Sequence, residues 1–150
     1  MSGFSAVDSG LLLNLSIDTL PLTGTADMWS VVRLATALLR GQAEQELAVG
    51  TRRILQMATI DGARGLGIDD VTGSLTPGKR ADLIMVRTDD ISTAPFTNAP
   101  NLLALAAGAE NVDTVVVDGR ILKRHGRLTQ VDPDRVVRST TAALEALLAR

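Results

Sequence analysis

The most constraining feature of this 150-residue sequence is an apolar run that ends in a carboxylate. The run is Leu11–Ile17, LLLNLSI, and it lies between Gly10 and Asp18. A short apolar run bounded by turn signals predicts a strand that is buried on both faces. Such a strand needs neighbours on both sides, because an open edge leaves backbone N–H and C=O groups unpaired. The first 60 residues offer no second strand, so the sequence predicts that this strand finds its neighbours elsewhere.

Helical periodicity follows the loop after Asp18. Asp27 precedes apolar residues spaced three and four apart, which predicts a helix with Asp27 as its N-cap. Gly41 interrupts this pattern, and two further glycines, Gly65 and Gly67, end the helical region as C-terminal caps. The predicted helices are 28–40, 42–50 and 51–64.

Beyond residue 80 the pattern changes to short β-rich runs. Asp118-Gly119 between two such runs predicts a two-residue hairpin turn, and Gly126 predicts another turn. Pro133 suits the first turn of a closing helix. The predicted elements are strands 81–86, 114–117, 120–123 and 128–131, a helical patch 102–107, and a helix 134–149.

Composition excludes several classes of protein. Aromatic residues make up 2% of the chain and the formal net charge is −2, which argues against nucleic-acid binding. The absence of cysteine excludes disulfides and thiolate metal sites. No apolar run is long enough to span a membrane, and the N-terminus lacks the charged region of a signal peptide. A cytoplasmic location is therefore predicted.

Two long motifs resemble a known enzyme family. They are MATIDGARGLGIDDVTGSLTPGKRADLIMV, residues 57–86, and VDTVVVDGRILKRHGRL, residues 112–128. Both resemble segments of the metal-dependent amidohydrolase superfamily, in the branch of cytosine deaminase and chlorohydrolase-like enzymes. They occur in the same order as in that family and together span about half of the chain.

The resemblance implies an α/β fold that is incomplete in this chain. Enzymes of this family have a TIM-like (β/α)8 barrel beside a small β-sandwich. By analogy, residues 1–67 form the end of the barrel, with its last β/α unit, and residues 68–131 form the C-terminal part of the sandwich. Residues 132–150 form a closing helix, so the chain resembles the C-terminal portion of an amidohydrolase.

The resemblance also implies roles for individual residues. Asp18 corresponds to the aspartate that ends the last barrel strand, where barrel enzymes place their chemistry. It would be catalytic, binding a divalent metal and moving a proton during attack by water. Thr19, Thr23 and Asp27 are the candidates for the substrate loop, with helix capping as the alternative role for Asp27. Zinc is the expected metal, with iron or manganese as alternatives.

The family's metal-binding histidines are missing from this sequence, whose one histidine is His125 in the hairpin region. A catalytic zinc usually has three protein ligands, so this chain is expected to be inactive alone, and a chain without a bound metal is the alternative to a divalent ion. The first hypothesis is a fragment of an enzyme that cleaves C–N bonds of a small-molecule substrate. Its partner would be a complementing N-terminal chain or a second copy. The alternative is a non-catalytic remnant that serves as an oligomerising or partner-binding module.

Two turns, one carboxylate and the closing helix are predicted to have structural roles. Pro77-Gly78-Lys79 lacks the spacing of a phosphate-binding loop, so a structural turn is predicted there. Asp82 is predicted to pair with Lys79 or Arg80, and His125 to lie in an exposed hairpin turn. The closing helix carries an apolar stripe that predicts a packing face against the barrel or sandwich, with an oligomer contact as the alternative.

Overall fold

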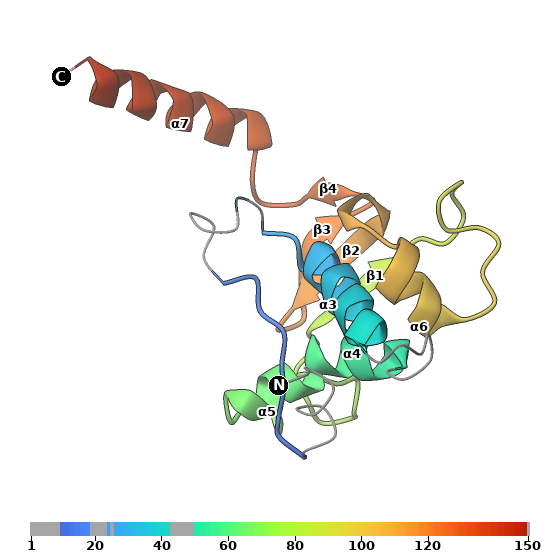
Figure 1. The fold of residues 1–150 in the computed structure, drawn as a ribbon. Coiled ribbons are helices and arrows are strands. Elements are labelled where there is room, and N and C mark those ends of the chain that lie inside the picture. Colours follow the sequence, from blue (N-terminus) through green and yellow to red (C-terminus); the bar gives the residue numbers. More distant parts are fainter. Residues whose placement is uncertain (1–9, 19–23, 25, 43–49, 150) are drawn as a thin grey trace.

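The computed structural model of the chain describes residues 10–18, 24, 26–42 and 50–149 (Figure 1). The predicted helix 42–50 lies outside the described residues except at its two ends. The helices are α3 (Met28–Gln42), α4 (Thr51–Met57), α5 (Ile60–Gly65), α6 (Ala99–Asn101), the π-helical turn η1 (Leu102–Ala106), the 3₁₀ turn η2 (Ala109–Asn111) and α7 (Pro133–Leu148). The strands are β1 (Leu83–Val86), β2 (Val112–Val117), β3 (Arg120–Arg124) and β4 (Arg127–Leu128).

A small apolar core joins the helices. Val32 of α3, Ile54 and Met57 of α4 and Ala104 of η1 are buried together. Val32, Ala35 and Leu39 lie on the side of α3 that faces this core. The predicted apolar face is only partly confirmed, because it also includes Leu34 and Leu38, which are 60% and 54% exposed. Figure 1 shows α3 beside α4.

The β-rich part forms one four-stranded antiparallel sheet with the order β1-β2-β3-β4. Asp118 and Gly119, at the β2–β3 turn, have φ angles of 50° and 75°. His125 and Gly126, at the β3–β4 turn, have φ angles of 50° and 74°. Positive φ at both central residues is the conformation that two-residue hairpins require, so both predicted turns are confirmed.

The predicted strand 11–17 is not hydrogen-bonded into a sheet in this structure. Leu11 is 61% exposed and Leu12 is 50% exposed, so the prediction of burial on both faces is wrong for this chain. The physical reason is that, among the described residues, the strands of the sheet pair only with one another and none lies beside this segment, which therefore lacks the neighbours that a buried strand needs.

The predicted helix 51–64 is divided into α4 and α5 at Ala58 and Thr59. Thr59 has φ −133° and ψ −95°, outside the helical range, and its hydroxyl donates to the carbonyl of Leu55 at 2.7 Å. A threonine that bonds the preceding turn competes with helical backbone bonding, which is consistent with a break at this point.

The closing helix α7 begins as predicted but packs differently. Asp132 is its N-cap, because its side chain accepts hydrogen bonds from the amides of Asp134 and Arg135, and Pro133 occupies the first turn. All of its residues are exposed, and Figure 1 shows it projecting from the rest of the chain. The predicted packing against the sandwich is therefore wrong within the described residues, and packing against the rest of a barrel stays a prediction. Among the described helices, none is both long and apolar enough to cross a membrane.

Candidate active-site segment at Asp18

The segment before Asp18 has two different faces. Leu13, Leu15 and Ile17 are half-buried, and the first two pack against the core of α3, α4 and η1. The alternate residues Leu12, Asn14, Ser16 and Asp18 are exposed. Alternate side chains of an extended segment lie on opposite faces. The segment is thus anchored on its apolar face, and it carries Asp18 on its open face with Asn14 and Ser16.

A backbone bond fixes the segment on the helices. The amide of Leu15 donates to the carbonyl of Met57 at 3.0 Å, at the end of α4. Met57 is 4% exposed and Ile54, one turn earlier, is fully buried, so this attachment point belongs to the best-packed part of the chain. The carboxylate of Asp18 is consequently three residues from a rigid anchor.

Asp18 itself has an uncommon backbone conformation. Its φ is 56°, and its amide donates to the hydroxyl of Ser16 at 3.1 Å. A positive φ at a residue other than glycine is uncommon, and such residues occur preferentially at functional sites. The turn ends the extended segment at the residue that the sequence singles out.

Asp27 caps α3, as the sequence predicts. Its carboxylate accepts from the amide of Trp29 at 3.0 Å and from the hydroxyl of Ser30, and Arg33 lies 3.7 Å away. The hydrogen bond from Ser30 is the main cause that holds the pKa of Asp27 below its ordinary value. Arg33 also donates to the carbonyl of Ala107 at 2.7 Å, which ties α3 to η1. The role of Asp27 toward a substrate stays a prediction.

The other substrate-loop candidates, Thr19 and Thr23, lie outside the described residues. Among the residues that are described, no group of three or more His, Asp or Glu side chains could hold a metal ion. Asp18 provides one carboxylate, whereas a catalytic divalent ion needs about three protein ligands. The described residues therefore do not fit a catalytic metal by themselves.

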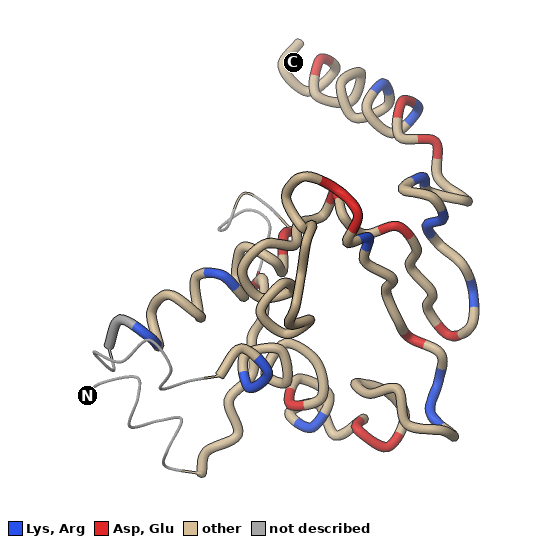
Figure 2. The backbone as a smooth tube through the Cα atoms, turned by 90° about the vertical axis from the view of Figure 1, so that its right-hand side faces the viewer, with Lys and Arg blue, Asp and Glu red and all other residues tan. Residues whose placement is uncertain are grey.

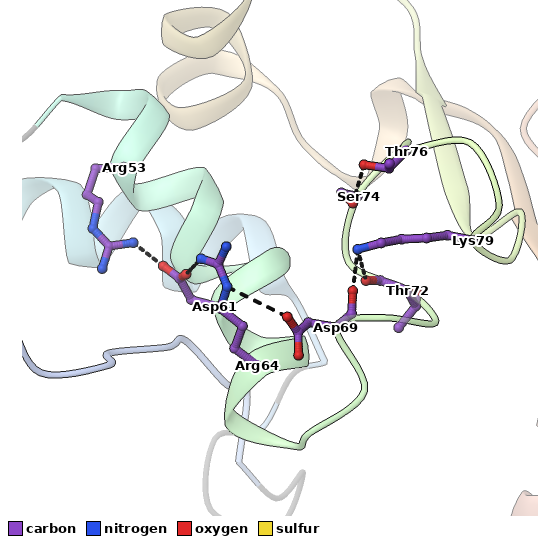
Figure 3. Close-up of polar contacts among 8 residues, drawn as sticks. All are labelled: Arg53, Asp61, Arg64, Asp69, Thr72, Ser74, Thr76 and Lys79. Carbon is purple, nitrogen blue, oxygen red and sulfur yellow. Dashed lines mark hydrogen bonds and ion pairs between the residues drawn. The ribbon is translucent and has the colours of Figure 1, made fainter.

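An ion-pair network centred on the buried Asp61 joins α4 and α5, and the sequence does not predict it (Figure 3). The side chain of Asp61 is 3% exposed and accepts from Arg53 of α4 and from Arg64 at 2.8 Å. Burial raises the pKa of Asp61, but the hydrogen bonds from the two arginines outweigh it and leave the pKa lowered. The (i, i+3) spacing of Asp61 and Arg64 was the available signal.

The turn after α5 is structural, as predicted. Lys79 donates to the backbone carbonyls of Asp69 and Thr72, so it closes the loop on itself (Figure 3). Asp82 accepts from the amide of Asp118 at 2.6 Å and from the hydroxyl of Thr72 at 2.7 Å. The bond from the Asp118 amide is the main cause of its lowered pKa. The predicted pairing of Asp82 with Lys79 or Arg80 is thus wrong, because neutral donors occupy its oxygens.

Comparison with known proteins places the chain in a family. The model of the amidohydrolase family matches residues 5–122. The chain belongs to the amidohydrolase family. It is 33% identical to a 5′-deoxyadenosine deaminase of Methanothermobacter thermautotrophicus over 92% of this chain and 32% of that protein. It is 38% identical to a 5-methylthioadenosine/S-adenosylhomocysteine deaminase of Desulfitobacterium hafniense over 86% of this chain and 30% of that protein.

Solved amidohydrolase structures agree with this assignment. An adenosine deaminase from Xanthomonas campestris with bound zinc superposes with a TM-score of 0.92 at 26% identity, over 99% of this chain and 34% of that one. An atrazine chlorohydrolase from Arthrobacter aurescens, complexed with zinc, gives a TM-score of 0.84 at 26% identity, over 93% and 31%. The chain spans about a third of the length of the relatives it matches. The predicted resemblance to amidohydrolases is confirmed, including a partial fold.

Family membership does not decide the metal, the domain limits, the location or the partners of this protein. The solved neighbours carry zinc, which supports a divalent metal in the family, while the metal of this protein stays a prediction. The limits 1–67, 68–131 and 132–150, the cytoplasmic location and the partner chains also stay predictions. Within the described residues, the part predicted to belong to a sandwich contains the sheet β1–β4.

Proposed function

We propose that this chain is part of a metal-dependent hydrolase that removes an amino group from an adenine-type nucleoside, and that Asp18 is its contribution to the chemistry. The observation that carries the proposal is the superposition of 99% of the chain on a zinc-containing adenosine deaminase with a TM-score of 0.92. Sequence relatives named as deaminases of 5′-deoxyadenosine and S-adenosylhomocysteine point to the same substrate class. The reaction replaces a C–N bond by a C–O bond, consumes water and releases ammonia.

Asp18 would act as an acid–base group in this reaction. An exposed carboxylate on a rigid support can accept a proton from an attacking water and return it to the leaving amine. Leu13 and Leu15 hold the segment on the helices, and the turn at Asp18 ends it at the reacting centre. The remaining ligands and acid–base groups would come from the two thirds of the relatives' length that this chain does not span.

Asp27 and Arg33 would have a positioning role in the proposed site. The loop that contains Thr19 and Thr23 ends at the cap of α3, which Asp27 and Arg33 fix to η1. A fixed end restricts the conformations of a loop, so this cap would help Thr19 and Thr23 to face the substrate.

The test begins with the protein purified from its own source and examined by native mass spectrometry. A complex with a histidine-bearing chain and one or two divalent ions is expected. The same sample should release ammonia from 5′-deoxyadenosine or S-adenosylhomocysteine and convert the adenine absorbance to that of hypoxanthine. If the sample instead releases ammonia from a triazine or from cytosine but from neither nucleoside, the protein is still a hydrolase. The proposal of an adenine-type substrate is then refuted.

A different result would favour the alternative function. A metal-free chain without ammonia release from any of these compounds would refute the catalytic proposal. If that chain also forms a stable complex with a partner or with itself, the non-catalytic interaction module is the better description. Supplying zinc to the sample separates loss of metal during purification from a true absence of activity.

A further inference from the structure

The hairpin of β3 and β4 concentrates positive charge on a chain whose formal net charge is −2. Residues 119–131 contain no aspartate or glutamate, and their basic side chains are Arg120, Lys123, Arg124 and Arg127. Figure 2 shows Lys and Arg but no Asp or Glu along this hairpin. A local excess of one sign of charge raises the concentration of ions of the opposite sign. The hairpin is therefore a candidate surface for an anion.

Two of these basic residues lie directly opposite each other. Arg124 of β3 is paired with Arg127 of β4, on either side of the turn at His125 and Gly126, and both arginines are exposed. Residues paired in this way point to the same face of the sheet, with Cβ atoms about 4.5–5.5 Å apart, and like charges at such positions destabilise a hairpin. The hairpin thus presents two guanidinium groups side by side at a cost to its own stability.

The other basic side chains of the hairpin have acceptors within the chain. Lys123 donates to the carbonyl of Ala109 at 3.3 Å, and Arg120 donates to the side-chain oxygen of Gln130 at 3.3 Å. Among the described residues, neither Arg124 nor Arg127 forms an ion pair with a carboxylate.

The carboxylate beside the turn, that of Asp113, is engaged by other groups. It accepts from the hydroxyl of Thr114 at 2.8 Å and lies 3.8 Å from Nδ1 of His125. The charge of Arg124 and Arg127 is therefore not compensated by this neighbouring acid, and it is available to an anion from outside the chain.

The chemistry of the two arginines favours a phosphate group as the ligand. A guanidinium group is a planar fork of N–H donors that matches both carboxylate and phosphate oxygens. A carboxylate has one charge and two oxygens, which a single arginine satisfies by a bidentate contact. A phosphate monoester has a charge of about −1.5 to −2 at neutral pH and three acceptor oxygens, so it can bind both arginines at once. We propose that Arg124 and Arg127 together bind the phosphate group of a small anion.

The charge of the rest of the chain indicates the size of the ligand. The hairpin supplies four of the 15 positive charges and none of the 17 negative charges, so the remaining residues have a formal net charge of −6. A long polyanion or an anionic membrane would meet the field of these residues as well as that of the hairpin. A phosphate ion or a small phosphate ester contacts the end of the hairpin alone. Because the site is exposed, binding in the millimolar range is expected.

This inference uses neither Asp18 nor the proposed reaction, so the failure of one leaves the other intact. The first experiment adds inorganic phosphate to the full chain at constant pH and ionic strength, with sodium chloride as the balancing salt. The backbone amide signals of residues 123–128 should shift in NMR spectra and reach saturation in the millimolar range. The same shifts on exchange of one chloride concentration for another would show that only screening is observed, and would overturn the proposal.

Substitution of either arginine tests whether the two act together. Arg124→Gln and Arg127→Gln should each raise the dissociation constant of phosphate about tenfold, and the double variant should lose the saturable shift. Arg135→Gln is the matched control, because it removes the same charge from an exposed position on α7 and should leave the dissociation constant unchanged. An equal effect of all three single substitutions would mean that net charge alone attracts the anion, and would refute a site at the hairpin.

A charge reversal separates binding from stability. Arg127→Glu turns the like-charge pair into an ion pair across the hairpin, so it should raise the unfolding midpoint in the absence of phosphate. The same variant should lose phosphate binding. A purely structural role of Arg127 predicts the opposite change in the midpoint. Retained binding, or a lowered midpoint, would contradict the proposal.

The source of the phosphate group is tested with three further probes. Glycerol 3-phosphate should bind at least as tightly as inorganic phosphate and should shift the same amide signals. Vesicles of phosphatidylcholine and phosphatidic acid should not sediment the chain, and a single-stranded RNA should not retain it. Sedimentation with the vesicles or retention by RNA that Arg124→Gln abolishes would overturn the small anion and assign the two arginines to a membrane or to a nucleic acid.

Discussion

Two regions of this amidohydrolase portion differ in whether their carboxylates are bonded within the chain or exposed. In the region 57–86, two carboxylates are bonded within the chain: Asp61 is held by Arg53 and Arg64, and Asp82 is held by Thr72 and Asp118. The segment 11–18 satisfies only one face, by packing Leu13 and Leu15 on the helices, and it leaves Asp18 exposed.

This difference distinguishes carboxylates that stabilise the fold from a carboxylate that is available for a reaction. A carboxylate whose oxygens are occupied by fixed donors is held ionised and takes no further part, whereas an exposed carboxylate on a rigid support remains available. We therefore expect substitutions at bonded carboxylates such as Asp61 to change stability and substitutions at Asp18 to change activity.

The largest effect is expected at Asp18. In the assembled enzyme, Asp18→Asn should lower the rate of ammonia release at least about 100-fold, because an amide cannot accept the proton. The unfolding midpoint and the assembly should hardly change, since Asp18 is exposed. Asp70→Asn, a change of the same chemistry at another exposed position, is the control. Full activity of Asp18→Asn would refute the role of Asp18.

The next effect is expected at Asp61. Asp61→Ala should lower the free energy of unfolding by about 2–3 kcal/mol, because it removes two charge-assisted hydrogen bonds. In this variant water can solvate the two guanidinium groups, because Arg53 is 33% and Arg64 is 52% exposed. The decrease in the free energy of unfolding should therefore be smaller than for a fully buried ion pair. Denaturant titration measures it. Asp69→Asn, whose carboxylate is 47% exposed, should cost much less, and an equal loss would contradict the special role of Asp61.

A smaller effect is expected at Gly73. Its φ is 84°, and a Cβ added there would lie 2.7 Å from the Cβ of Ala63. Gly73→Ala should therefore cost about 2 kcal/mol, from backbone strain and steric overlap together. Gly78→Ala is the matched control, because Gly78 has φ 95° and nothing within 4 Å of the added Cβ. If both variants lose the same free energy, the contact with Ala63 has no part in the cost.

The smallest effect concerns Asp90. Hydrogen bonds from Ser92 and then Thr93 lower its pKa to about 2. A carboxyl whose pKa is lowered on folding stabilises the fold above its unfolded pKa of about 3.9. That contribution is lost as the pH falls from about 4 toward 2. Asp90→Asn should flatten the dependence of the unfolding midpoint on pH in this window. An unchanged slope between the two proteins would exclude Asp90 as a contributor.

The features that follow from local sequence could be predicted. The turn at Asp118-Gly119 and the cap at Asp27 depend on residues within a few positions of each other, and both are as expected. Asp18 could be singled out because an acid that ends an apolar run is unusual. Its positive φ could not, since that depends on how the segment is attached.

The features that depend on distant partners could not be predicted. Residues 11–17 can form a β-strand only if another strand lies beside them. The apolar composition of the segment does not reveal whether such a strand is present. The break at Thr59 and the pairing of Arg53 with Asp61 depend on how α4 and α5 pack. The exposure of α7 contradicts the prediction of packing against the sandwich because an apolar stripe specifies burial without naming its partner.

The bond between Leu15 and Met57 has a consequence for how such a protein could assemble. This bond restricts the backbone of the 11–18 segment before any neighbouring strand pairs with it, so such an association would lose less conformational entropy than folding both strands together. A template of this kind favours fast capture of the complementary piece. It would also make the division between this portion and the rest of an amidohydrolase a practical place to cut and rejoin the family's enzymes.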